Sequence, residues 1–248
     1  MPSDAQRRCA RALRSLLFHD APALRVTPDR FADLKALADA AIALDRDPNR
    51  HLTIPAACDA AGVDEATVHK EYTDPRELLT LTYGLVIDQY HFLCAATDGY
   101  ETFSFEEKLA SFYFIVLDTL GEHRPFVQET FDTSIRQRSS FRSDVRAALR
   151  DLLTSDDVPN TTQLVTGLWP VQEVLTEITV FIIRSWMEDD SENQEATTAL
   201  IDKLVAFVAE LVTFRGVQRG IDLAWYLYQS DTLGLGRLPL VGWLFRRR

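Results

Sequence analysis

Apolar residues recur every three or four positions along most of this chain. The clearest series run through residues 31–42, 105–120, 164–182 and 200–211. This period matches the turn of an α-helix, which places such residues on one face. Nowhere do apolar and polar residues alternate over the length of a strand between turn residues, so no β-strand is predicted. The pattern therefore predicts an all-α protein.

Capping and turn residues divide the chain into about ten helices. Thr27-Pro28 and Thr53-Ile54-Pro55 each place a capping hydroxyl just before a proline in the first turn, which is a typical helix start. Gly62, Gly99 and Gly121 mark helix ends. The predicted helices cover residues 28–45, 54–61, 65–72, 75–96, 103–121, 124–137, 140–154, 161–187, 193–214 and 217–230.

Composition and charge narrow the class of protein. The chain has 248 residues, and 37 Asp and Glu against 26 Lys and Arg give a formal charge of -11. This acidity speaks against a simple basic nucleic-acid binder. Asp outnumbers Glu by 23 to 14, and Arg outnumbers Lys by 22 to 4. A halophilic source would explain the acidic, lysine-poor surface, and a GC-rich genome would explain the preference for Arg; both explanations stay open.

Few residues suggest catalysis, metal binding or secretion. Cys9, Cys58 and Cys94 have no metal or redox spacing, and the five histidines offer no ligand pair on one helix face. No phosphate loop or nucleophile motif occurs. The N-terminus lacks a signal-peptide core, and no apolar run reaches the ~18–20 residues of a membrane span. We expect a cytoplasmic protein that is not an enzyme and has no cofactor or metal.

Residues 53–72 predict a helix-turn-helix. A short helix is followed by a tight turn at Gly62, where a left-handed backbone is needed, and then by a second short helix. Ile54, Ala57, Val63 and Val68 form the shared apolar seam. Taken alone, a structural helical hairpin is the better interpretation. With a helix before it and several after it, the second helix can instead enter a DNA major groove.

In this context the chain resembles the TetR family of bacterial transcriptional regulators over about residues 28–215. Residues 53–79 read TIPAACDAAGVDEATVHKEYTDPRELL, close to the family pattern T-x-x-x-I-A-x-x-A-G-V-S-x-G-T-x-Y-x-x-F-x-x-K-E-x-L-L. Residues 186–203 read WMEDDSENQEATTALIDK and are similar to the family's W-x-x-D-D-S segment before a helix that begins T-x-x-x-I-D.

The resemblance implies a division of the chain and a set of partners. It implies a helix-turn-helix DNA-binding domain (28–80) and a helical regulatory and dimerisation domain (81–230). A basic amphipathic extension (1–27) precedes them, and an apolar-basic tail (231–248) extends past the usual family end. The expected partners are double-stranded DNA with a palindromic operator and a small-molecule effector. A second copy is expected to pack through the helices near 161–187 and 193–214, although a larger monomeric core would also bury them.

The resemblance also implies DNA-contacting positions. They are Thr53, Asp64, Glu65, Ala66, Thr67, His69, Lys70 and Arg76. Asp64 and Glu65 depart from the family's Ser and Lys, and carboxylates repel phosphates, although they can accept from cytosine. The simpler interpretation of Asp64 is a helix N-cap. The acidity is heavier elsewhere, because residues 1–92 carry a net charge of -3 and residues 93–248 carry -8.

Aromatic residues are frequent in the regulatory half, where family members bind small, often apolar ligands. The candidate ligand residues are Phe112, Phe126, Phe131, Trp169, Glu173 and Phe181. Core packing is the simpler interpretation for most of these aromatics. Glu173 and Glu177 lie one helical turn apart and could meet a cationic ligand, although a solvated face is the simpler interpretation.

The last residues leave an alternative function open. Residues 238–248 combine Trp243 and other apolar side chains with three terminal arginines, as interfacial membrane anchors do. Packing on the regulatory domain is the simpler interpretation, so we expect no membrane partner. The expected function is a ligand-responsive transcriptional regulator, most simply a repressor. The alternative is a lipid or small-molecule binder of this fold that has lost operator binding and associates with membrane through the tail.

Overall fold

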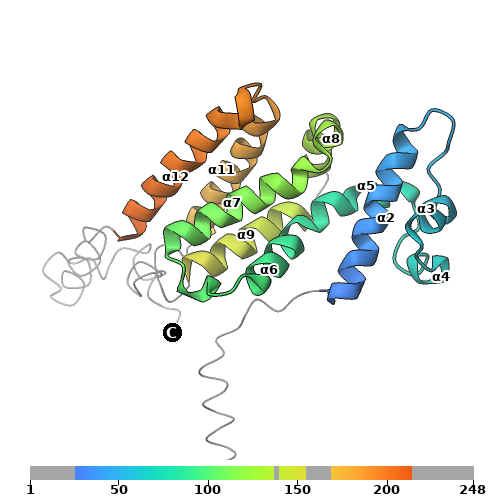
Figure 1. Cartoon of the computed structure of the whole chain (residues 1–248), viewed down its shortest axis with the longest axis horizontal. Helices are drawn as coiled ribbons and strands as arrows, with labels where there is room; N and C mark the ends of the chain where they lie inside the picture. Colours follow the sequence, from blue (N-terminus) through green and yellow to red (C-terminus); the bar gives the residue numbers. More distant parts are fainter. Residues whose placement is uncertain (1–25, 137–139, 155–168, 214–248) are drawn as a thin grey trace, which may run out of the picture.

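The computed structural model describes residues 26–136, 140–154 and 169–213 (Figure 1). Within these ranges there are ten α-helices, two short 3-10 turns and no strand, which confirms the all-α prediction. The helices are α2 (Pro28–Arg46), α3 (Ile54–Ala61), α4 (Glu65–Val68), α5 (Pro75–Gly84), α6 (Val86–Ala96), α7 (Phe105–Gly121), α8 (Arg124–Arg136), α9 (Ser140–Leu153), α11 (Trp169–Met187) and α12 (Glu195–Thr213). The 3-10 turns are η1 (Tyr100–Thr102) and η2 (Glu192–Gln194).

Helix starts follow from local capping. Thr27 and Thr53 accept hydrogen bonds from amides in the first turns of α2 and α3, each of which has a proline among its first two residues. Asp74 and Ser104 form reciprocal capping boxes with Glu77 and Glu107 at the starts of α5 and α7. These side chains satisfy amides that have no partner inside the helix.

Two hydrophobic cores organise the helices. The smaller one is built by α2, α3, α4 and α5 at one end of the molecule (Figure 1). Its buried members are Leu37, Ala41, Leu44, Ile54, Ala57, Cys58, Val68 and Leu78. The larger core contains residues of α5, α6, α7, α8, α9, α11 and α12, and it also includes Ile42 of α2. Helix α2 therefore contributes to both cores.

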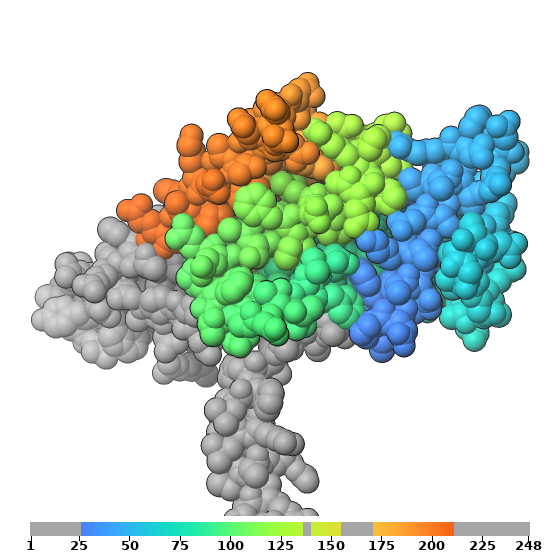
Figure 2. Space-filling view, viewed as in Figure 1, coloured from blue at the N-terminus to red at the C-terminus, as the bar shows by residue number. Residues whose placement is uncertain are grey.

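The larger core is a helical bundle with α11 and α12 as an antiparallel pair along one edge (Figure 1). Helix α11 packs mainly on α9, and α12 packs mainly on α7. The space-filling view shows α2 and α8 next to each other on the visible face (Figure 2). Arg46 of α2 pairs with Glu129 of α8 at 3.4 Å. The helix-turn-helix end is thus joined to the bundle by side chains as well as by the chain itself.

Two predicted helices were wrong in extent. The helix predicted over 75–96 is divided at Leu85, which follows Gly84, a residue with low helix propensity. The backbone bonds continue through the break, since the amide of Leu85 donates to Leu81 at 2.9 Å. The helix predicted to reach Tyr72 ends at Val68, because Tyr72 packs into the small core and the chain must turn before Asp74 caps α5.

Other predictions fall partly or wholly outside the described residues. The helix expected near 161–187 is described from Trp169 onward. The helix expected over 217–230 and the tail 231–248 lie outside, and so does nearly all of the extension 1–27.

Candidate functional site

The turn between α3 and α4 has the backbone that the sequence predicted. Gly62 has a φ of 70° and a ψ of 27°, in the left-handed region that favours glycine. The amide of Val63 donates to Cys58 at 3.0 Å, which completes the end of α3. Ala57 and Cys58 are almost fully buried, and their small side chains allow the helices to cross closely. The segment forms a helix-turn-helix whose second helix lies at one end of the molecule (Figure 1).

The outer face of α4 presents several of the predicted DNA-contacting residues. Glu65, Ala66, His69 and Lys70 are exposed, whereas Val68 anchors the helix in the small core. Thr53 lies at the start of α3, and Arg76 is exposed in the first turn of α5. All six of these predicted positions are therefore open to solvent.

Asp64 has a structural role in this segment. Its carboxylate accepts hydrogen bonds from the Thr67 hydroxyl at 2.8 Å and from the Thr67 amide at 2.9 Å. These bonds, the hydroxyl first, lower the pKa of Asp64 and keep it ionised. Asp64 is therefore the N-cap of α4, and the Thr67 hydroxyl is held by it rather than free to point outward.

The remaining charges around α4 are partly paired. Glu65 lies 3.2 Å from the imidazole of His69, one turn along the chain. Glu71 pairs with Arg30 of α2 at 2.8 Å, which ties the turn after α4 to the neighbouring helix. Lys70 is the one basic residue of the segment 64–72 apart from His69. The surface near α4 thus carries an acidic excess that DNA would have to tolerate.

The predicted ligand residues do not converge on one cavity. Phe112, Phe126 and Phe131 are buried in the large core, where Phe126 and Phe131 pack around Tyr83 with ring centroids 6.5 and 6.1 Å away. Phe181 is 56% exposed on the outside of α11. Trp169 begins α11, and its side chain is not among those described.

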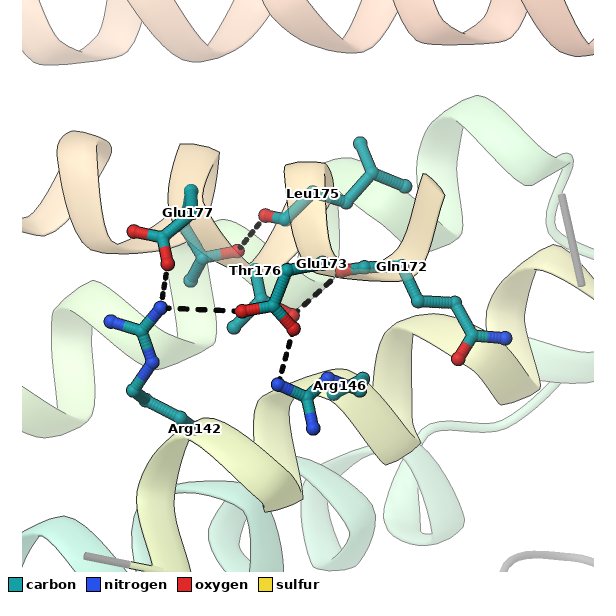
Figure 3. A network of polar contacts seen from close by, with 8 residues as sticks. Arg142, Arg146, Gln172, Glu173, Leu175, Thr176 and Glu177 are labelled. Carbon is teal, nitrogen blue, oxygen red and sulfur yellow. Dashed lines mark hydrogen bonds and ion pairs between the residues drawn. The ribbon is translucent and has the colours of Figure 1, made fainter. Parts of the chain in front are cut away.

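Glu173, the sixth predicted ligand residue, belongs to an ion-pair cluster. Glu173 and Glu177 of α11 face Arg142 and Arg146 of α9 (Figure 3). Arg142 pairs with Glu177 and lies 3.6 Å from Glu173, which also pairs with Arg146. Because two guanidinium groups already neutralise both carboxylates, this pair offers little to a cationic ligand.

A groove of about 720 Å³ lies between α7 and α12. Phe114, Leu117 and Ile201 give it an apolar wall, and Thr197, Thr198 and Asp118 add polar groups. It contains none of the six predicted ligand residues. The groove is open to solvent, so it offers a surface site and not an enclosed cavity.

The polar side chains buried within the bundle come partly from α11. Thr176 and Thr179 are fully buried, and both hydroxyls donate to backbone carbonyls one turn earlier. Tyr113 of α7 lies beside Thr179, and burial raises the pKa of Tyr113 to about 12.

The segment W-x-x-D-D-S forms the junction between α11 and α12. Asp189 accepts hydrogen bonds from the amides and hydroxyls of both Ser191 and Thr197, at 2.5 to 2.9 Å. Arg124 of α8 lies over the Trp186 ring at 5.2 Å and donates to the carbonyls of Trp186 and Asp189 at 2.8 Å. The motif therefore fixes the angle between the last two described helices.

Sequence reasoning missed the arginines that pair with Glu173 and Glu177. The signal was present, because Arg142 and Arg146 have the same four-residue spacing on another helix. It also missed the role of Asp189, although it had noted the motif around it.

Comparison with known proteins supports this architecture. Residues 108–227 match the family model described as tetracycline repressor-like, C-terminal domain. A search of curated proteins found no match. No helix among the described residues is long and apolar enough to cross a membrane.

Proposed function

We propose that this chain is a DNA-binding transcriptional repressor of the TetR family, released by a small, largely apolar effector. The observation that carries the proposal is the pairing of two independent features. Residues 108–227 match the family's C-terminal domain, and a helix-turn-helix with an exposed second helix lies outside that match, at residues 53–72.

DNA contact is proposed for the face of α4 and for both of its flanks. Lys70 and Arg76 supply positive charge to phosphates, and Ala66 and His69 are exposed where base edges would lie. Thr53 stands at the N-terminus of α3, where backbone amides also attract phosphate. The Asp64 carboxylate caps α4 and keeps this short helix folded, although its negative charge repels phosphate.

Binding to the chain's own promoter region tests this proposal. We expect sub-micromolar affinity that falls steeply with salt, since phosphate contacts release counterions. Lys70→Ala and Arg76→Ala should each weaken binding about 10-fold and lower the salt slope by about one. Arg150→Ala, which removes an exposed arginine on α9, is the matched control and should bind as the wild type does.

A homodimer and an internal effector site complete the proposal. Val174 and Phe181 of α11 and Phe207 of α12 are each more than half exposed, as expected for helices that pack on a second copy. An effector among the bundle aromatics would change the spacing of the two α4 helices, which must fit successive major grooves about 34–36 Å apart. The effector can shift the balance between the DNA-binding and released conformations only by the difference between its binding free energies for these two conformations.

A second function is favoured by one observation, the acidic excess at α4. A chain that has lost operator binding would serve as a lipid or small-molecule binder near membranes. In that case no sequence-specific DNA binding is expected at any salt concentration. Association with anionic liposomes, lost on deletion of residues 238–248, would then identify the alternative.

A further inference from the structure

One cluster of metal-binding side chains lies between the two cores. Asp39 of α2 faces Glu122 and His123, the two residues that join α7 to α8. One ligand atom from each of the three lies within 4.8 Å of the others. His123 Nε2 is 2.7 Å from Asp39 Oδ1, a hydrogen-bond distance. A small separation, to about 3.3 Å, would give these two atoms the spacing of two ligands in a tetrahedral zinc site.

We propose that Asp39, Glu122 and His123 bind a divalent transition-metal ion such as Zn²⁺. One imidazole nitrogen with two carboxylate oxygens suits a borderline cation better than Mg²⁺ or Ca²⁺, which prefer oxygen ligands alone. The side chains remain 25 to 45% exposed, so an ion can enter from solvent and retain water in its open positions.

The neighbourhood of the cluster sets its charge balance. Lys35, one turn before Asp39 on α2, places its ammonium group 2.7 Å from the Glu122 carboxylate. Asp39 and Glu122 together carry two negative charges, of which Lys35 neutralises one. A divalent ion would neutralise both, and Lys35, already 35% exposed, would turn to solvent.

Metal binding also moves a proton. In the hydrogen bond to Asp39, Nε2 of His123 carries the proton, so this nitrogen must lose it to ligate a metal. In the neutral ring the hydrogen then sits on Nδ1, and Nε2 offers its lone pair to the ion.

The position of the cluster gives the ion a structural consequence. Asp39 lies on α2, whose buried residues build the helix-turn-helix core, whereas Glu122 and His123 belong to the bundle. Glu122 also lines the groove between α7 and α12. The ion would tie α2 to the α7–α8 junction and so restrain the helix-turn-helix relative to the bundle.

The test uses the full chain, stripped with a chelator, and is read without DNA, so it is independent of the proposed repressor function. Titration with Zn²⁺ should give saturable one-site binding by calorimetry, and a 100-fold excess over Kd should raise Tm by roughly 5–10 °C. Glu122→Gln and His123→Ala should weaken binding at least about 10-fold. His51→Ala, an exposed histidine elsewhere, should leave it unchanged.

Lys35→Met separates a metal site from a simple ion-pair contact. If the ammonium competes with the ion, this variant binds Zn²⁺ more tightly than the wild type. Zn²⁺ binding that is absent, equal in Glu122→Gln and the wild type, or weakened in Lys35→Met would overturn the proposal. Glu122→Gln is isosteric and lies at an exposed position, so it keeps the test valid if His123→Ala does not fold.

Discussion

At the scale of single residues, two carboxylates lie at the start of α4. Asp64 and Glu65 are both acidic and exposed, but they differ in their contacts. Asp64 caps α4 through two bonds to Thr67, whereas Glu65 contacts the imidazole of His69. Asp64 is therefore needed for the helix itself, and Glu65 chiefly adds negative charge.

Replacing Glu65 should strengthen DNA binding. Glu65→Gln removes one charge that repels phosphate while the rest of α4 stays as it is, so we expect operator affinity to rise about threefold at low salt. Fluorescence anisotropy with a labelled promoter fragment measures this. Glu101→Gln removes an exposed charge far along the chain and should have no effect. An affinity lowered by Glu65→Gln would mean that Glu65 reads a base directly.

Asp189 should make the stability of the folded chain depend on pH. Its four hydrogen bonds, led by the Ser191 hydroxyl, hold the pKa of Asp189 well below its usual range. A depressed folded pKa gives stability that is complete above the unfolded pKa, about 3.9, and is lost as pH falls below it. Asp189→Asn should lower Tm by about 5 °C at pH 7, and this difference should shrink below about pH 4.

Thermal unfolding of both forms between pH 3 and pH 7 checks this prediction. Asp190→Asn is the matched control, because Asp190 is the exposed neighbour of Asp189 in the same turn. A Tm difference for Asp189→Asn that stays constant down to pH 3 would contradict the proposed cause.

At the scale of elements, ion pairs join α9 to α11. Arg146 and Glu173 are each about 30% exposed, between a surface pair and a buried one. A double-mutant cycle with Arg146→Ala and Glu173→Ala should therefore give a coupling energy of about 1 kcal/mol from urea unfolding. The exposed neighbours Arg150 and Asp151 should give a coupling close to zero. Equal couplings for the two pairs would show that the interhelical contact adds nothing.

What the sequence could predict at this scale was set by local chemistry. Thr27, Thr53 and Gly62 act on amides and dihedral angles within a few residues, so helix starts and the helix-turn-helix could be read directly. The break at Leu85 was not predicted, because α9 packs against both α5 and α6 and the hydrophobic period is the same in either case.

The candidate sites also differ in how far the sequence alone could predict them. The α4 face follows from a motif contiguous in sequence, so its exposed positions were predictable. The burial of the bundle aromatics was not predictable in this way. Phe112 and Phe181 each lie in a helix with a similar apolar period, but Phe112 is buried in the core and Phe181 is exposed. Asp39 and His123 are 84 positions apart, and only the tertiary fold brings them together.

At the scale of the whole molecule, exposed apolar side chains lie on the paired helices α11 and α12. Phe181 and Phe207 are 56% and 58% exposed, unusually open for phenylalanine. A second copy packed on these helices would bury both, and it would also hold two α4 helices at a fixed separation. Dimerisation and DNA binding should therefore be lost together.

Charged substitutions test this link. Phe181→Asp and Phe207→Asp should turn a dimer into a monomer in light scattering, because each places a carboxylate in the apolar interface. Helical circular dichroism should be retained, since both residues are exposed in the single chain. Operator affinity should fall at least about 100-fold, because one half-site loses its partner. Leu93→Asp, at an exposed position on α6, should stay dimeric and bind DNA; a monomeric wild type that still binds a palindromic operator tightly would contradict the model.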